Sequence, residues 1–156
     1  MIVAKMILAF YCLGLVALAQ SPPQVATLTL QDKYLRYILI TLGTPGKDRA
    51  LVQQQEAALV SLLSLNSDEL SALESLAARY GKLITTFRTD RHAVIASRTT
   101  LSAADQATLD GYVTKLDQDI NTLTNAIMTS VRSQTAARIA EGVAGLAKVE
   151  PTRGGN

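Results

Sequence analysis

Apolar residues recur along most of this chain at intervals of three and four positions, the spacing that gives an α-helix one apolar face. Alternating runs of Val, Ile and Thr, which would indicate strands, have no useful length here. The apolar stripes divide the chain into four segments, residues 30–42, 47–65, 67–97 and 102–147. The pattern therefore predicts an all-α fold, a helical bundle in which two short helices precede two long ones.

The two long segments carry the most regular stripes. In the first, the apolar positions are Leu70, Leu73, Leu76, Tyr80, Leu83, Ile84, Phe87 and Val94. In the second they are Leu109, Val113, Leu116, Ile120, Leu123, Ile127 and Val131, and the stripe thins beyond Gln134. The link over 98–101 is short, so the two helices are expected to form a long antiparallel hairpin. Residues whose numbers sum to about 200 then face each other, for example Phe87 and Val113, or Tyr80 and Ile120.

Residues suited to capping stand at the expected starts of both long helices. Asn66 or Ser67 can cap the first, and Glu69 completes a capping box with Asn66. Ser102 and Asp105 have the same spacing at the start of the second. Both long helices are therefore expected to begin at these residues.

Three glycines interrupt or end the stripes. Gly43 and the Thr44-Pro45-Gly46 turn are expected to end the helix over 30–42. Gly81 and Gly111 lie inside the long helices, where each costs about 1 kcal/mol relative to alanine. We expect close packing of a neighbouring helix at both positions, with a local bend as the alternative.

The amino-terminal segment differs in character from the rest of the chain. Lys5 precedes an uninterrupted apolar run over 6–19, which as a helix is too short for the roughly 30 Å hydrocarbon core of a membrane. The run ends in Ala17-Leu18-Ala19, the small-x-small pattern that signal peptidase accepts. These features predict a cleaved signal peptide over 1–19, with a retained amino-terminal anchor as the alternative.

Export follows from this prediction, to the periplasm or outside the cell. The remaining chain is expected to form a single all-helical domain over 20–149 and a disordered tail over 150–156. Cys12, the single cysteine, leaves with the signal peptide, so the mature chain has no disulfide and no thiol chemistry. Lys5 leaves too, so 14 of the 15 basic residues face 13 acidic ones, a balance that argues against a nucleic-acid binder.

Charged residues divide between the two long helices. Basic residues gather toward the end of the first, at Arg79, Lys82, Arg88, Arg91 and Arg98. Acidic residues gather across the turn, at Asp105, Asp110, Asp117 and Asp119. The basic residues could form an anion site, but the two runs are placed to neutralise each other, and we favour a solvated face. Asp90 and Arg91 interrupt the apolar stripe, which indicates either a polar pocket or, as we favour, a frayed end.

The sequence names no catalytic, cofactor-binding or metal-binding residue. His92 is the single histidine and has neither a nucleophile nor a second metal ligand beside it, so we expect it to face solvent. Asp117-Gln118-Asp119 imitates the start of a calcium loop, but Thr122 and Met128 occupy the positions that require Gly and Glu. No P-loop, nucleophile elbow or zinc-protease motif occurs, and we do not expect an enzyme.

Part of the sequence resembles known helical proteins. Tyr34, Tyr37 and Leu65-Asn66-Ser67-Asp68-Glu69-Leu70, followed by the hairpin stripes, resemble a group of small secreted bacterial proteins without a known activity. The layout is more distantly similar to the Spy/CpxP-type periplasmic stress proteins, whose helices open with a Leu-Thr-x-x-Gln motif. The segment here departs from that motif at the threonine and the glutamine. The distant resemblance implies a chaperone or metal-stress role and transfers no site residue.

Abundant amphipathic helix without clustered reactive groups favours a non-enzymatic function. We expect an envelope protein that interacts through helical surfaces with partner or unfolded polypeptides, or with itself. The alternative is a carrier of a small molecule or lipid, with an apolar cavity between the helices lined by residues such as Tyr34, Tyr37 and Leu59.

Overall fold

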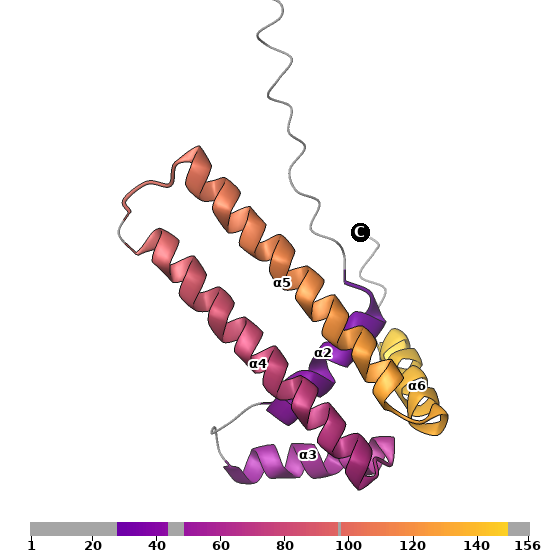
Figure 1. Ribbon diagram of the computed structural model, residues 1–156. Helices are drawn as coiled ribbons and strands as arrows, with labels where there is room; N and C mark the ends of the chain where they lie inside the picture. Colours follow the sequence, from indigo (N-terminus) through magenta and orange to yellow (C-terminus); the bar gives the residue numbers. More distant parts are fainter. Residues whose placement is uncertain (1–27, 44–48, 97, 150–156) are drawn as a thin grey trace, which may run out of the picture.

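The computed structural model describes residues 28–43, 49–96 and 98–149, and Figure 1 shows their arrangement. Five helices follow one another within these ranges: α2 (Leu30–Gly43), α3 (Arg49–Leu63), α4 (Ser67–Ile95), α5 (Ala103–Ser130) and α6 (Ser133–Val149). The described residues contain no strand, so the predicted all-α fold is confirmed. The predicted signal peptide, the Thr44-Pro45-Gly46 turn and the tail from Glu150 lie outside the described residues.

The helices α4 and α5 form the predicted antiparallel hairpin, and the other three helices gather around one end of it (Figure 1). The core lies at that end. Its buried members are Tyr34, Leu35, Ile38, Leu39, Leu59, Leu63, Leu73, Leu76, Ala77, Leu123, Ile127 and Ile139. They come from every helix, so the core joins all five elements. None of the described helices has both the length and the apolar character needed to cross a membrane.

Both predicted capping boxes are present. The Glu69 backbone N–H donates to Asn66 Oδ1 at 2.8 Å, and the Asn66 N–H donates to Glu69 Oε2 at 3.0 Å. The same reciprocal pair joins Ser102 and Asp105, at 3.2 and 3.0 Å. Asn66, not Ser67, is therefore the cap of α4. Each box satisfies backbone N–H groups that the first helical turn leaves without a partner.

The segment over 102–147 is two helices, where the sequence predicted one. The first, α5, ends at Ser130, Val131 is extended with φ −115° and ψ 155°, and α6 begins at Ser133. The reason lies in another part of the chain. Glu69 Oε1 accepts the backbone N–H of Arg132 at 2.8 Å and the hydroxyl of Thr135 at 2.8 Å, which holds the start of a separate helix against α4. From there α6 packs against α2 and α3.

Two cavities indicate the register of the hairpin, because Leu83 shares one with Leu116 and Lys82 shares the other with Asp119, pairs whose numbers sum to about 200 as predicted. At its packed end Leu73, Ile120 and Ile127 are all buried. Farther along, Phe87 shares a cavity wall with Tyr112, while Val113 is 47% exposed. Tyr112, one position before the predicted partner Val113, is therefore the residue that lines this cavity opposite α4.

Close packing occurs at two glycines, and neither is Gly81 or Gly111. A Cβ atom on Gly43 would lie 2.8 Å from the Ala77 carbonyl oxygen, and one on Gly142 would lie 2.6 Å from the Tyr34 hydroxyl oxygen. At Gly81 the nearest atom would be in ordinary contact at 3.9 Å, and at Gly111 nothing lies within 4 Å. Close packing as the reason for Gly111 is therefore wrong. Gly43 ends α2 as predicted, and it also lets α2 approach the backbone of α4.

Candidate functional site

The far part of the hairpin extends beyond the other helices (Figure 1). We call residues 81–95 of α4 and 103–119 of α5 the distal half. Within it Asp105 is the single buried residue. The rest of the hairpin has six buried apolar side chains, those of Leu73, Leu76, Ala77, Ile120, Leu123 and Ile127. The apolar stripes continue through the distal half. On one side α2 reaches its base, where Ile40 lines a cavity with Ile84 and Arg36 lies 3.6 Å from Asp117. On another side the cavities between α4 and α5 have no lining residue from α2, α3 or α6.

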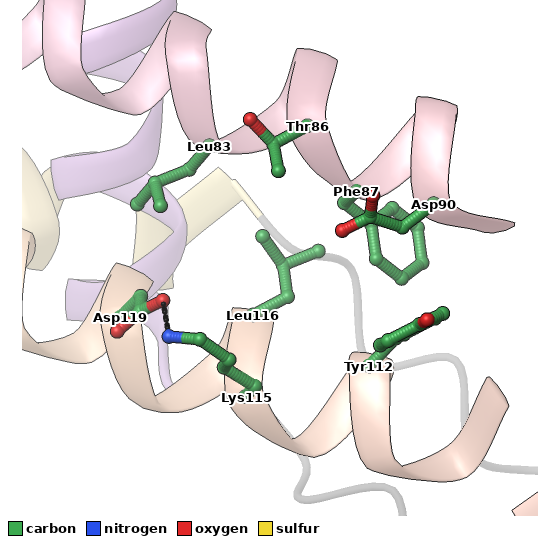
Figure 2. A pocket seen from close by; sticks show the side chains of 8 residues that line it. All are labelled: Leu83, Thr86, Phe87, Asp90, Tyr112, Lys115, Leu116 and Asp119. Carbon is green, nitrogen blue, oxygen red and sulfur yellow. Dashed lines mark hydrogen bonds and ion pairs between the residues drawn. The ribbon is translucent and has the colours of Figure 1, made fainter. Parts of the chain in front are cut away.

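A hollow runs along one side of the seam between α4 and α5. One cavity of about 110 Å³ is lined by Leu83, Thr86, Phe87, Asp90, Tyr112, Lys115, Leu116 and Asp119 (Figure 2). A second of about 360 Å³ is lined by Arg79, Lys82, Leu83, Thr86, Asp119, Thr122 and Leu123. The two share Leu83, Thr86 and Asp119 and so lie next to each other along the seam, and together we call them the seam groove. All of its lining residues belong to α4 or α5.

The seam groove has an apolar floor and a charged rim. Figure 2 shows Leu83 and Leu116 pointing into the space between the helices, with the Phe87 and Tyr112 rings at one end. On the rim, Lys115 Nζ donates to Asp119 Oδ2 at 2.7 Å, one helical turn along α5. Asp90, Lys115 and Asp119 are the charged residues that line the smaller cavity.

Asp90 belongs to this rim. The sequence suggested that Asp90 and Arg91 mark either a polar pocket or a frayed helix end. Since α4 continues to Ile95, the frayed end is wrong. Asp90 is half-buried and lines the smaller cavity, as the pocket interpretation required.

The structure does not gather the basic run into one anion site. Arg79 and Lys82 line the seam groove, whereas Arg88 lines a different cavity of about 440 Å³ that α4 forms with α2. Arg91 is exposed and lines neither. Within the described residues these four cations form no ion pair.

The expected neutralisation between the two charged runs is confirmed at one position. Arg98 forms an ion pair with Asp105 at the tip of the hairpin. The other acidic partners are elsewhere: Asp117 lies 3.6 Å from Arg36 of α2, and Asp119 pairs within α5. Most of the positive charge of α4 thus stays uncompensated within the described part of the chain.

Glu69 is the most extensively bonded polar residue outside the groove, and it is only 4% exposed. Besides its bonds to Asn66, Arg132 N and Thr135, its Oε2 accepts from the Arg132 guanidinium at 2.9 Å. Hydrogen bonds from Arg132, then from the Asn66 backbone and Thr135, outweigh burial and lower the pKa of Glu69 from 4.5 to about 2. Both carboxylate oxygens accept two hydrogen bonds each, so the lone pairs of Glu69 are all used in stabilising the fold.

Tyr34 lies beside a separate cavity of about 270 Å³, together with Leu62, Arg138, Glu141 and Gly142. Its hydroxyl is buried and has no hydrogen-bond partner among the described residues, and burial raises the pKa of that phenol. The carrier hypothesis placed Tyr34, Tyr37 and Leu59 around one cavity. Tyr37 is instead 50% exposed, and Leu59 is part of the buried core.

His92 is exposed on α4, as expected. Within the described residues no three His, Cys, Asp or Glu side chains lie close enough to hold a metal ion. Sequence reasoning did not single out Thr86, Tyr112 or Lys115 as groove residues, although helical spacing places them beside the apolar stripes. Comparison of the chain with protein-family models, with curated proteins and with solved structures gave no match.

Proposed function

We propose that this is an exported, non-enzymatic protein that binds polypeptides along its α4–α5 hairpin, in the manner of an envelope interaction protein or a chaperone. One observation carries the proposal. The apolar stripes of the hairpin continue through the distal half, where Leu83, Phe87 and Leu116 are only half-buried and no described helix covers them. Apolar surface of this kind, bordered by charge, is typical of protein interaction sites.

The dimensions of the seam groove favour a polypeptide over a small molecule. Its α4 wall runs from Arg79 to Asp90, which corresponds to about three helical turns and roughly 17 Å. The groove is elongated, with one row of side chains from α4 and one from α5. Such a surface fits an amphipathic helix, which places an apolar residue over the floor at every turn. The predicted signal peptide places the protein in the periplasm or outside the cell. A helical protein exported there can act on other polypeptides by binding alone.

Suppression of aggregation tests this proposal. We expect the purified protein to slow the aggregation of an unfolded model client and Thr86→Arg to weaken that effect, because Thr86 is exposed at the centre of the groove. Ala78→Arg is the matched control, since Ala78 is equally exposed on α4 but lines no part of the groove. If the protein neither slows aggregation nor retains any polypeptide in a pull-down, the proposal fails.

A further inference from the structure

We propose that a second copy of this chain occupies the seam groove. The two hairpins then form a four-helix bundle about a two-fold axis that runs along the seam, with both hairpin tips at the same end. This inference rests on the proposed function, because it names one polypeptide that the same groove binds, and a client would compete with that second copy for the groove. It is carried by the distribution of charge on α4 and α5 and by the positions of the groove residues.

The two helices carry opposite charge. From residue 79 to residue 98 the basic residues outnumber the acidic ones, with Asp90 as the single acid. From residue 103 to residue 119 the acidic residues outnumber the basic ones, with Lys115 as the single base. Among the described residues no ion pair joins α4 to α5 directly, because Arg98, which pairs with Asp105, lies in the link after α4. The hairpin is therefore complementary in charge to a partner that places an acidic helix beside α4 and a basic helix beside α5.

A two-fold axis along the seam supplies that partner. It places α4 of each copy over α5 of the other, without changing the height of any residue along the bundle. Every helix then has two neighbours, both antiparallel to it and both of opposite charge, as in a four-helix bundle. An axis across the hairpin would instead place α4 over α4 and bring the basic residues of both copies together.

The groove residues match under this symmetry. Lys82 and Asp119 line the same cavity and so lie at the same height, which brings Lys82 opposite the partner's Asp119. Asp90 and Lys115 both line the smaller cavity, which brings Asp90 near the partner's Lys115. Each contact occurs twice in the dimer, since an isologous interface repeats every pair. An unrelated acidic helix would satisfy Arg79 and Lys82 but would meet Asp90 and Asp119 with like charge.

Apolar contact accompanies this match. Leu83, Phe87 and Leu116 form the groove floor, and the hairpin of a second copy would cover them. No residue of α2, α3 or α6 lines the groove. The α2 side of the hairpin, where Arg88 borders a separate cavity, stays outside the interface.

Charge reversal with complementation tests the pairing. Sedimentation equilibrium is expected to show a dimer for the natural chain, and Lys82→Glu and Asp119→Lys are each expected to raise its dissociation constant about tenfold or more, because each places like charges opposite one another twice. A mixture of the two variants is expected to restore association as a heterodimer, in which both contacts again pair opposite charges. Arg88→Glu, on the α2 side of α4, is the matched control and is expected to leave the dimer unchanged.

The direction of the hairpins is tested by spin labels. A label on Thr100→Cys, in a Cys12→Ala background, marks the hairpin tip at an exposed position. The proposed bundle places the two labels close together, whereas opposite hairpins would separate them by about 40 Å, the length of a 28-residue helix.

Three results overturn the inference: a monomer at every concentration, labels at opposite ends, or a dimer that Lys82→Glu leaves unchanged. A monomer that still protects the client through Thr86 refutes the dimer and leaves the proposed function standing. A dimer that complements as described, but neither protects a client nor retains any other polypeptide, refutes the chaperone-like role and leaves the pairing.

Discussion

At the scale of single residues, Glu69 shows how one carboxylate can order two helices. It completes the capping box of α4, and it also binds the backbone and side chain of Arg132, 63 positions later, where α6 begins. Both helix starts carry unpaired N–H groups and partial positive charge, so a single buried anion stabilises them together. The cost of burying its charge is offset by hydrogen bonds to every acceptor site.

Replacement of this carboxylate is expected to destabilise the protein substantially. Glu69→Gln keeps the shape of the side chain but removes the charge and turns one acceptor into a donor facing Arg132. We expect a loss of about 3 kcal/mol in the free energy of unfolding, measured by urea titration. Glu74→Gln, at an exposed position of the same helix, is expected to change stability little. Equal losses in both variants would contradict the role assigned to Glu69.

The stabilisation from Glu69 should also depend on pH in a defined window. Its pKa is about 2 in the folded protein and close to the ordinary 4.5 when unfolded. A carboxyl whose folded pKa is lowered contributes fully above the unfolded pKa and loses that contribution as pH falls toward the folded one. The difference in unfolding free energy between the natural chain and Glu69→Gln is therefore expected to shrink between pH 4.5 and about 2. A difference that stays constant over this window would show that the charge contributes nothing.

At the scale of helices, the same substitution, glycine to alanine, is expected to have opposite effects on stability at two positions. Gly142→Ala places a methyl group 2.6 Å from the Tyr34 ring and hydroxyl, so either the Tyr34 ring or α6 must shift, at a cost of about 1–3 kcal/mol. Gly111→Ala meets nothing within 4 Å and gains helix propensity, which is expected to stabilise by about 1 kcal/mol. Thermal unfolding of both variants measures the contrast. Stabilisation by Gly142→Ala would refute the close approach of α6 to Tyr34.

The end of α3 makes a second prediction at this scale. Ser64 has φ 51°, in the left-handed region, and the Leu65 N–H donates to the Val60 carbonyl at 3.1 Å, which is the bond pattern of a Schellman cap. Glycine adopts this conformation without a steric cost, so Ser64→Gly is expected to stabilise by about 0.5–1 kcal/mol. Gln54→Gly, at an exposed position inside α3, is expected to destabilise by about 0.5 kcal/mol and serves as the control. Denaturant midpoints that shift in the same direction would contradict this account.

At the scale of the whole molecule, the core occupies one end of the hairpin and leaves the other end projecting. The three helices α2, α3 and α6 cover the packed end, where Leu73, Leu76, Leu123 and Ile127 are buried. The distal half repeats the same apolar spacing, and among the described helices α2 reaches its base, at Ile84 and Asp117. A projecting half with an apolar seam and helices of opposite charge is the feature on which both the proposed function and the proposed dimer depend.

Local chemistry explains what the sequence by itself determined. Periodicity predicted four helical segments, of which the last proved to be two helices. The Asn66–Glu69 and Ser102–Asp105 boxes marked two helix starts, because these signals act between residues one turn apart. The hairpin and its register followed from a short link and two matched stripes. The acidic and basic character of α4 and α5 was also evident from the chain alone.

Only the tertiary structure decided the break between α5 and α6, the partners of Asp117 and Glu69, and the close packing at Gly43 and Gly142. The break depends on Glu69, which lies far away in sequence, and Gly43 and Gly142 are required by side chains and backbone of other helices. The seam groove arises because α2, α3 and α6 cover one end of the hairpin and not the other. These features result from contacts between distant segments, which residue spacing along the chain does not encode.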